Sequence, residues 1–141
     1  MSTISPKLAA FFADYEQGTQ TPGSDSVSRL YAESFLFAGP DGARTLSRDE
    51  LRQVAPKREG YFKALGLSAS RIVDLQEQAL DERYALVRAE WRMTFARPDT
   101  DPRDVTLAAT YLLHVTAAGP RIVVQIDHQD FARRVRELGL A

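Results

Sequence analysis

The alternation of apolar and polar residues in the second half of the chain constrains its fold more than any other feature. Successive side chains of a β-strand point to opposite faces of a sheet. In residues 83–96 the residues at every second position are apolar, while those between them are mostly charged or polar. The apolar set is Val87, Ala89, Trp91, Met93 and Phe95. This stretch therefore predicts a strand with one apolar face and one charged face.

Similar patterns predict strands near 69–79, 105–117 and 121–128, joined by short turn-forming segments. In the last strand, strict alternation places Ile122, Val124 and Ile126 on the apolar face. Val123, Gln125 and Asp127 would then share the opposite face. Together the four strands predict an antiparallel meander that is covered on one side.

The first half of the chain is patterned for helices, which would form the covering layer. Ser5-Pro6 predicts a helix start, and residues 8, 11, 12 and 15 make an apolar stripe. Asp25 can begin a second helix that contains Tyr31, followed by a short strand at 35–38. Ser47 and Glu50 form a capping box for a helix that runs toward Gly66. Pro56 lies inside that helix and predicts a kink or a break into two short helices.

Asp130 can cap a last short helix. The 141 residues suit a single domain, 1–141. The expected fold class is α+β: a curved antiparallel sheet wrapped by N-terminal helices into a cone with an internal apolar pocket. The chain has no cysteine, which excludes disulfides and thiol chemistry.

The charge and hydropathy of the chain exclude several classes of partner. A net charge of −1 gives no broad field to attract nucleic acid or an anionic membrane. No apolar run approaches the roughly 20 residues that span a bilayer. The first seven residues lack the basic-then-apolar pattern of a signal peptide, so we expect a soluble, cytoplasmic protein.

The order of predicted elements, with the segments 31–35 (Tyr-Ala-Glu-Ser-Phe) and 39–42 (Gly-Pro-Asp-Gly), resembles the nuclear transport factor 2-like superfamily. That group includes the SnoaL-like polyketide cyclases and ketosteroid isomerase. The resemblance implies a conical fold with a pocket between the helices and the concave sheet face. It also implies a homodimer packed through the sheet, and Leu112 and Val123 on the outer face agree with such a partner surface.

The isomerase chemistry can be compared with these residues one by one. The resemblance would place a carboxylate base directly before Pro40, but Gly39 stands there. It would place an acidic donor in the strand at 105–117, which contains neither Asp nor Glu. The isomerase also requires a tyrosine, and Tyr15 matches that position by its spacing from Pro40. Steroid isomerase activity is therefore not expected.

Two sets of residues are candidates for the pocket. The ligand-binding candidates are aromatic or soft apolar residues: Trp91, Tyr111, Tyr31, Phe12 and Met93. The acid–base candidates are His128, Tyr15 and Asp41. His128 continues the alternation of Ile126 and is predicted to point to the pocket rim, where an imidazole could transfer protons. Alternatively, the apolar set is plain core, and His128 and Asp41 hydrogen-bond the local backbone.

Three functional hypotheses follow. The first is a domain that binds a small hydrophobic molecule. The second is a cofactor-free enzyme, such as a cyclase, isomerase or dehydratase, that acts on a hydrophobic ring substrate; a purely structural dimerisation module is a third reading. Nucleotide-binding, hydrolase and zinc-protease motifs are absent. The chain has no cysteine and its two histidines are predicted on opposite faces, so we expect no metal site. We also expect no cofactor.

Overall fold

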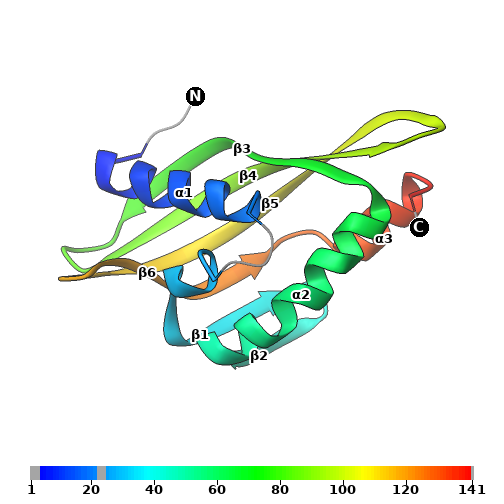
Figure 1. The fold of residues 1–141 in the computed structure, drawn as a ribbon. Coiled ribbons are helices and arrows are strands. Elements are labelled where there is room, and N and C mark those ends of the chain that lie inside the picture. The colour runs from blue at the N-terminus through cyan, green and yellow to red at the C-terminus, as the bar shows by residue number, and fades with distance from the viewer. Residues whose placement is uncertain (1–3, 22–24, 141) are drawn as a thin grey trace.

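The structure is a computed structural model that describes residues 4–21 and 25–140. In these ranges, three helices pack against one six-stranded sheet (Figure 1). The helices are α1 (Pro6–Thr19), α2 (Arg48–Leu65) and α3 (Phe131–Glu137), with a 3-10 turn, η1 (Ser28–Leu30). The strands are β1 (Tyr31–Gly39), β2 (Gly42–Ser47), β3 (Leu67–Ala79), β4 (Tyr84–Arg97), β5 (Thr100–Thr116) and β6 (Gly119–Asp127).

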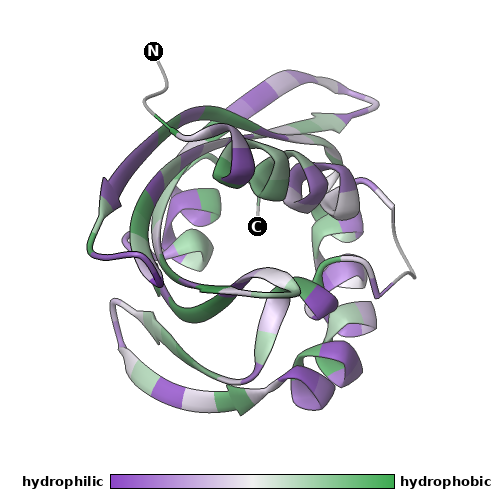
Figure 2. Ribbon diagram, turned by 90° about the vertical axis from the view of Figure 1, so that its left-hand side faces the viewer, coloured by the Kyte–Doolittle hydropathy of each residue, from purple (hydrophilic) through white to green (hydrophobic). Residues whose placement is uncertain are grey.

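The strands lie in the order β2-β1-β6-β5-β4-β3. All neighbours are antiparallel except β1 and β6, which pair in parallel, so the sheet is mixed. Viewed at right angles to Figure 1, the sheet curves around the helices, and hydrophobic and hydrophilic residues alternate along its strands (Figure 2). The predicted α+β fold of a curved sheet wrapped by helices is confirmed.

The segment before β1 differs from its prediction. The helix expected from Asp25 to Tyr31 is a single 3-10 turn, and Tyr31 already begins β1; residues 22–24 of that segment lie outside the described ranges. The strand of 31–39 hydrogen-bonds to β2 on one side and to β6 on the other. Pairing on both sides provides hydrogen-bond partners for the backbone N–H and C=O groups, which a short isolated helix would leave partly unpaired. The aromatic residues of this segment also favour a strand.

Helix α2 begins at the predicted capping box. The backbone N–H of Glu50 donates to the Ser47 hydroxyl at 3.0 Å, and the backbone N–H of Ser47 donates to the Glu50 carboxylate at 3.2 Å. The helix runs unbroken through Pro56, so the alternative of two short helices is wrong. Pro56 and Arg52, whose carbonyl loses its partner, are both exposed. Water can therefore replace the lost hydrogen bond.

A β-bulge in β6 inverts the faces of that strand. Leu112 of β5 pairs with Val124, but Leu113 pairs with Ile122, so Val123 is an extra residue. One extra residue moves every later side chain to the opposite face. Gln125 is consequently buried on the inner side, with 4% of its surface exposed, while Ile126 is 37% exposed. The prediction that Val124 and Ile126 point inward is wrong, because strict alternation ignores the bulge.

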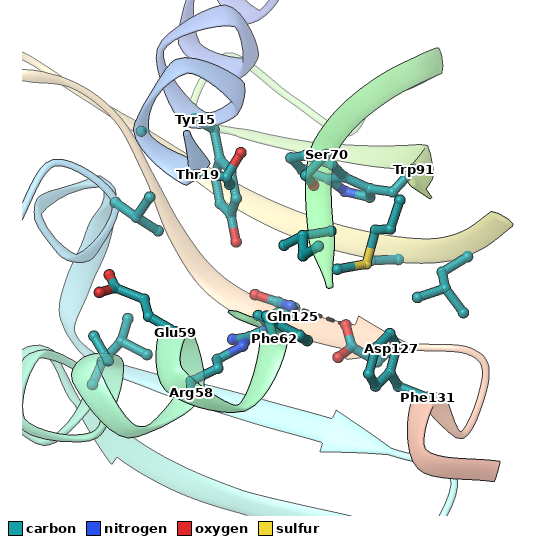
Figure 3. A pocket seen from close by; sticks show the side chains of 18 of the residues that line it. Tyr15, Thr19, Arg58, Glu59, Phe62, Ser70, Trp91, Gln125, Asp127 and Phe131 are labelled. Atoms are coloured by element: carbon teal, nitrogen blue, oxygen red, sulfur yellow. Dashed lines mark hydrogen bonds between the residues drawn. The ribbon is translucent and has the colours of Figure 1, made fainter. Parts of the chain in front are cut away.

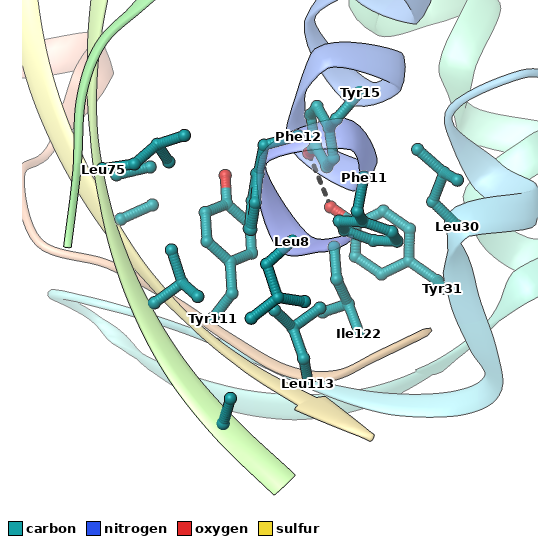
Figure 4. Close-up of a cluster of buried hydrophobic side chains, with 14 of the residues drawn as sticks. Leu8, Phe11, Phe12, Tyr15, Leu30, Tyr31, Leu75, Tyr111, Leu113 and Ile122 are labelled. Carbon is teal, nitrogen blue, oxygen red and sulfur yellow. Dashed lines mark hydrogen bonds between the residues drawn. The ribbon is translucent and has the colours of Figure 1, made fainter. Parts of the chain in front are cut away.

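The core lies between α1 and the concave face of the sheet (Figure 4). Phe12 of α1 is fully buried and packs edge-to-face on Tyr111 of β5, with ring centroids 5.2 Å apart. Phe95, Val105 and Val135 belong to a second cluster beneath α3. Trp91 of the first cluster and Met93 of the second are successive inward residues of β4, and both also line the cavity described below. No helix among the described residues is long and apolar enough to cross a membrane.

Candidate ligand-binding site

A cavity of about 440 Å³ lies between α2, the end of α1 and the inner face of the sheet (Figure 3). Its volume is within the roughly 300–1,000 Å³ range of small-molecule pockets. Much of its lining is apolar or aromatic, including Trp91, Met93, Leu107, Phe62 and Phe131. The polar lining includes Tyr15, Arg58, Glu59, Gln125 and Asp127. This combination of apolar walls and a few polar groups is typical of sites that bind small organic molecules.

A chain of hydrogen bonds runs along one wall of the cavity, through the lining residues Tyr15, Gln125 and Asp127 and the buried Tyr31 behind them. The hydroxyls of Tyr15 and Tyr31 are 2.7 Å apart, as the dashed line in Figure 4 marks. The Tyr31 hydroxyl donates to Oε1 of Gln125. The Gln125 amide donates to Oδ1 of Asp127 at 2.9 Å (Figure 3). These hydrogen bonds therefore connect the end of α1 to the end of β6 through three buried side chains and the half-buried Asp127.

Burial dominates the acid–base properties of the tyrosines around this chain. Desolvation raises the pKa of Tyr15 above its ordinary value of 10.0, although the bond to Tyr31 opposes the shift. Desolvation also raises the pKa of Tyr31 and of Tyr111 well above that value, and the neighbouring Tyr15 adds to both shifts. All three hydroxyls are therefore neutral at physiological pH and serve as hydrogen-bonding groups, not as anions.

Helix α2 contributes a cationic group on the other side of the cavity. The Arg58 guanidinium carbon lies 5.3 Å from the centre of the Phe62 ring, one helical turn later. Its charge lowers the pKa of both Tyr15 and Tyr31, against the larger effect of burial. In Figure 3 its nitrogen atoms point toward the side of the cavity that holds Gln125. The cavity lining therefore includes a positive group, Arg58, and a carboxylate, Glu59, on α2, and a second carboxylate, Asp127, on β6.

Four of the predicted site residues line the cavity: Trp91, Met93, Tyr111 and Tyr15. Trp91 and Tyr111 are joined by a hydrogen bond from the indole Nε1 to the hydroxyl, at 3.2 Å. Because the polar atom of each aromatic ring is paired with the other, the rings are held in place without a ligand. The cavity wall is thus largely preformed at these two residues.

Phe12 and Tyr31 lie behind the wall instead of in it. Phe12 stacks on Tyr15 with ring centroids 6.4 Å apart and has no exposed surface. Tyr31 packs at 4.5 Å from Phe35 and reaches the site through its hydroxyl alone. Both residues belong to the first core cluster, which fixes the orientation of Tyr15 and Tyr111.

The structure does not bring the predicted acid–base set together. His128 is exposed, and its Nε2 lies 2.7 Å from the Thr110 hydroxyl on the outer face. The prediction that it points to the pocket rim is wrong, because the bulge at Val123 reverses the alternation on which it was based. Asp41 is exposed in the turn between β1 and β2 and does not line the cavity. Of the three, only Tyr15 reaches the cavity.

Arg58, Gln125 and Asp127 were not predicted as site residues. Arg58 could have been found, because Leu51, Ala55, Arg58 and Phe62 follow helical spacing and share one face of α2. Gln125 and Asp127 could not, since no residue of β6 signals the bulge that turns them inward. Within residues 4–21 and 25–140, no group of three or more His, Cys, Asp or Glu side chains could hold a metal ion.

Comparisons with known proteins agree on the fold. The model of a family described as "NTF2-like protein (DUF6841)" matches residues 3–130. No curated protein matches the chain. Among solved structures, an NTF-2 like protein of unknown function from Shewanella oneidensis is 14% identical, with a TM-score of 0.71 over 87% of this chain and 97% of that one.

Two further solved structures are similar over most of their length. The beta subunit of the benzoate 1,2-dioxygenase from Burkholderia mallei is 16% identical, with a TM-score of 0.71 over 94% of this chain and 95% of that one. A protein of unknown function with a cystatin-like fold from Nostoc punctiforme is 13% identical, with a TM-score of 0.66 over 94% of this chain and 97% of that one. At such identities these structures establish the shared fold and nothing about activity.

Proposed function

The chain belongs to the NTF2-like family, and we propose that its cavity binds a small hydrophobic molecule that carries a ring. The observation that carries this proposal is the cavity of about 440 Å³ with an aromatic wall that is already ordered. Trp91 and Tyr111 hold each other through their polar atoms, so a ligand does not have to order them. A preformed apolar site loses less entropy on binding than a flexible one.

The aromatic walls favour a flat molecule over a flexible aliphatic chain. Trp91 lies on the sheet side of the cavity, and Phe62 and Phe131 line it from α2 and α3. Aromatic rings attract each other in stacked or edge-to-face geometry and contribute roughly 0.5–1.5 kcal/mol per pair beyond simple area burial. A ring placed among these three side chains would gain such contacts on several sides.

Trp91 makes the proposal directly testable, because it is the one tryptophan in the chain. A two-dimensional proton–nitrogen NMR spectrum should show a single indole N–H signal, and that signal belongs to the cavity wall. We expect a naphthol probe to shift this signal in a saturable manner. A probe that binds elsewhere on the surface would leave it in place.

A pair of variants on α2 separates binding in the cavity from binding to the helix. Ala55 lines the cavity, and Ala64 lies on the exposed side of the same helix. Ala55→Phe fills part of the cavity and should weaken naphthol binding by at least about tenfold, which corresponds to about 1.4 kcal/mol. Ala64→Phe adds the same ring outside and should leave the affinity unchanged. Equal affinity in both variants, or no shift of the Trp91 signal, would overturn the proposal.

A further inference from the structure

The hydrogen-bond chain along the cavity wall can run in only one direction. A carboxylate has no proton to donate, so Asp127 must accept from its neighbour. Gln125 therefore presents its Nε2 to Asp127, and its Oε1 faces Tyr31. Tyr31 must donate its single proton to that oxygen. The contact of 2.7 Å between the two tyrosines then requires Tyr15 to donate to Tyr31.

This direction decides what the wall offers to a ligand. The Tyr15 hydroxyl donates its proton to Tyr31, so it cannot donate a hydrogen bond into the cavity. One oxygen of Asp127 accepts from Gln125, and the carboxylate keeps further lone pairs for another donor. Because Asp127 lines the cavity, that accepting capacity faces a ligand. The β6 side of the cavity thus calls for a ligand group that donates a hydrogen bond.

On α2, next to the Glu59 carboxylate, Arg58 offers hydrogen-bond donors to the cavity. The Arg58 guanidinium carries five N–H donors and no acceptor. In the described part of the chain, the ion pairs join Arg52 to Asp49 and Arg133 to Glu137, and none involves Arg58. Its guanidinium lies over the Phe62 ring, and a contact with a ring face leaves N–H donors available for a ligand. A guanidinium in this state suits a carboxylate, which can accept two parallel N–H bonds from it.

We propose that the ligand is an aromatic hydroxy acid whose carboxylate pairs with Arg58 and whose hydroxyl donates to Asp127. This inference rests on the proposed function, since it assigns the polar groups of the molecule that occupies the same cavity. The ring would lie among Trp91, Phe62 and Phe131, between the two polar ends. The protein then supplies a partner for the carboxylate, for the hydroxyl and for the ring of the ligand.

Four related probes separate the contributions of ring, carboxylate and hydroxyl. They are a hydroxynaphthoate, the methoxynaphthoate that cannot donate, the naphthoate without an oxygen substituent, and the naphthol without a carboxylate. Affinities are measured by calorimetry, and occupancy of the cavity is checked by the Trp91 indole signal. We expect the hydroxynaphthoate to bind at least about tenfold more tightly than each of the others, because hydrogen bonds to charged groups are the strong ones.

Two variants assign the preferences to their residues. Arg58→Gln should reduce hydroxynaphthoate affinity by about tenfold or more, and should reduce naphthol affinity far less because naphthol has no carboxylate to pair with Arg58. Asp127→Asn keeps an acceptor for Gln125 but can present an N–H to the cavity. It should therefore bring the ratio of hydroxynaphthoate to methoxynaphthoate affinity close to one. Lys57→Gln removes the same charge from an exposed neighbour on α2 that does not line the cavity, and it should change none of these affinities.

The outcomes separate this inference from the proposal on which it rests. If all four probes shift the Trp91 signal with equal affinity, the cavity binds rings and the hydroxy-acid inference is overturned. The same holds if Arg58→Gln and Lys57→Gln lower the affinity equally, because a general charge effect would then explain the preference. If no probe shifts the signal, the proposed function itself fails.

Discussion

Tyr31 links the packed core to the candidate site through one buried hydroxyl. The residue is 3% exposed, and its hydroxyl contacts both Tyr15 and Gln125. Its backbone carbonyl also accepts two hydrogen bonds from the Arg48 guanidinium, at 3.1 and 2.8 Å, which ties β1 to the start of α2. A substitution of Tyr31 should therefore alter the cavity wall, although Tyr31 itself does not line the cavity.

We expect Tyr31→Phe to lower the free energy of unfolding by about 1–3 kcal/mol at neutral pH, because two buried polar partners lose their bond. The pH dependence has a defined sign. The folded pKa of Tyr31 lies well above 10.0, so its contribution is complete below pH 10.0 and is lost as pH rises toward the folded pKa. The variant should therefore lose less stability than the natural chain above pH 10.0.

Denaturant unfolding at a series of pH values measures both effects. Tyr61→Phe is the matched control at neutral pH, because Tyr61 is 43% exposed and its hydroxyl is not part of the buried chain. A Tyr31→Phe protein as stable as this control would show that the buried hydroxyl contributes nothing to folding.

At the scale of elements, the junction of α2 and β3 depends on the backbone of one glycine. Gly66 ends α2 with a φ of 92°, a conformation that residues with a Cβ rarely adopt. A Cβ there would lie 2.5 Å from the Ala96 carbonyl oxygen. The backbone N–H of Ala96 donates to the Gly66 carbonyl at 2.8 Å, so the two segments cannot easily separate. This junction fixes where the cavity-lining face of α2 points.

Two glycine-to-alanine variants of this region should have opposite effects. Gly66→Ala should lower the free energy of unfolding by at least about 1–2 kcal/mol, the cost of the left-handed conformation before the clash is added. Gly60→Ala lies inside α2, where a Cβ meets nothing within 4 Å. It should stabilise the protein by about 0.5–1 kcal/mol through helix propensity. Thermal and denaturant unfolding check both, and two changes of the same sign would refute this account.

Much of this element arrangement follows from the sequence. The capping box, the long helix and the four long strands are local signals, and the alternation in β4 correctly brings Trp91 and Met93 to the inner face. Tyr31 was misassigned to a helix, since pairing of β1 with β2 and β6 decides its conformation from outside the segment. Asp127 was misplaced because the bulge at Val123 depends on the register between β5 and β6. Non-local pairing therefore limits what could be predicted about the site.

At the scale of the whole molecule, the outer face of the sheet carries a continuous row of apolar side chains. Leu36, Val124, Leu112 and Leu86 are cross-strand neighbours on β1, β6, β5 and β4. The inward residues next to them, such as Tyr111 and Val87, are fully buried, so the row faces away from the helices. Leu36 is 38% exposed. An outward apolar row across four strands favours the homodimer that we predict, packed through the sheet.

Light scattering coupled to size exclusion tests this assembly. We expect a mass of twice 15.7 kDa for the natural chain and a monomer for Leu112→Glu, because a buried unpaired carboxylate is costly in an interface. Ala13→Glu, on the exposed side of α1, should remain a dimer. A monomeric mass for the natural chain across the micromolar range would contradict the prediction.

The bulge at Val123 divides β6 into two parts in which opposite sets of alternate residues point inward. Before the bulge, the inward residue Ile122 belongs to the core. After it, the inward residues Gln125 and Asp127 line the cavity. A shift of one residue would exchange this polar wall for Val124 and Ile126. A single insertion or deletion in a sheet strand can therefore alter ligand chemistry as thoroughly as several substitutions. An alignment of such folds therefore needs to compare which strand residues point inward as well as which residue types match.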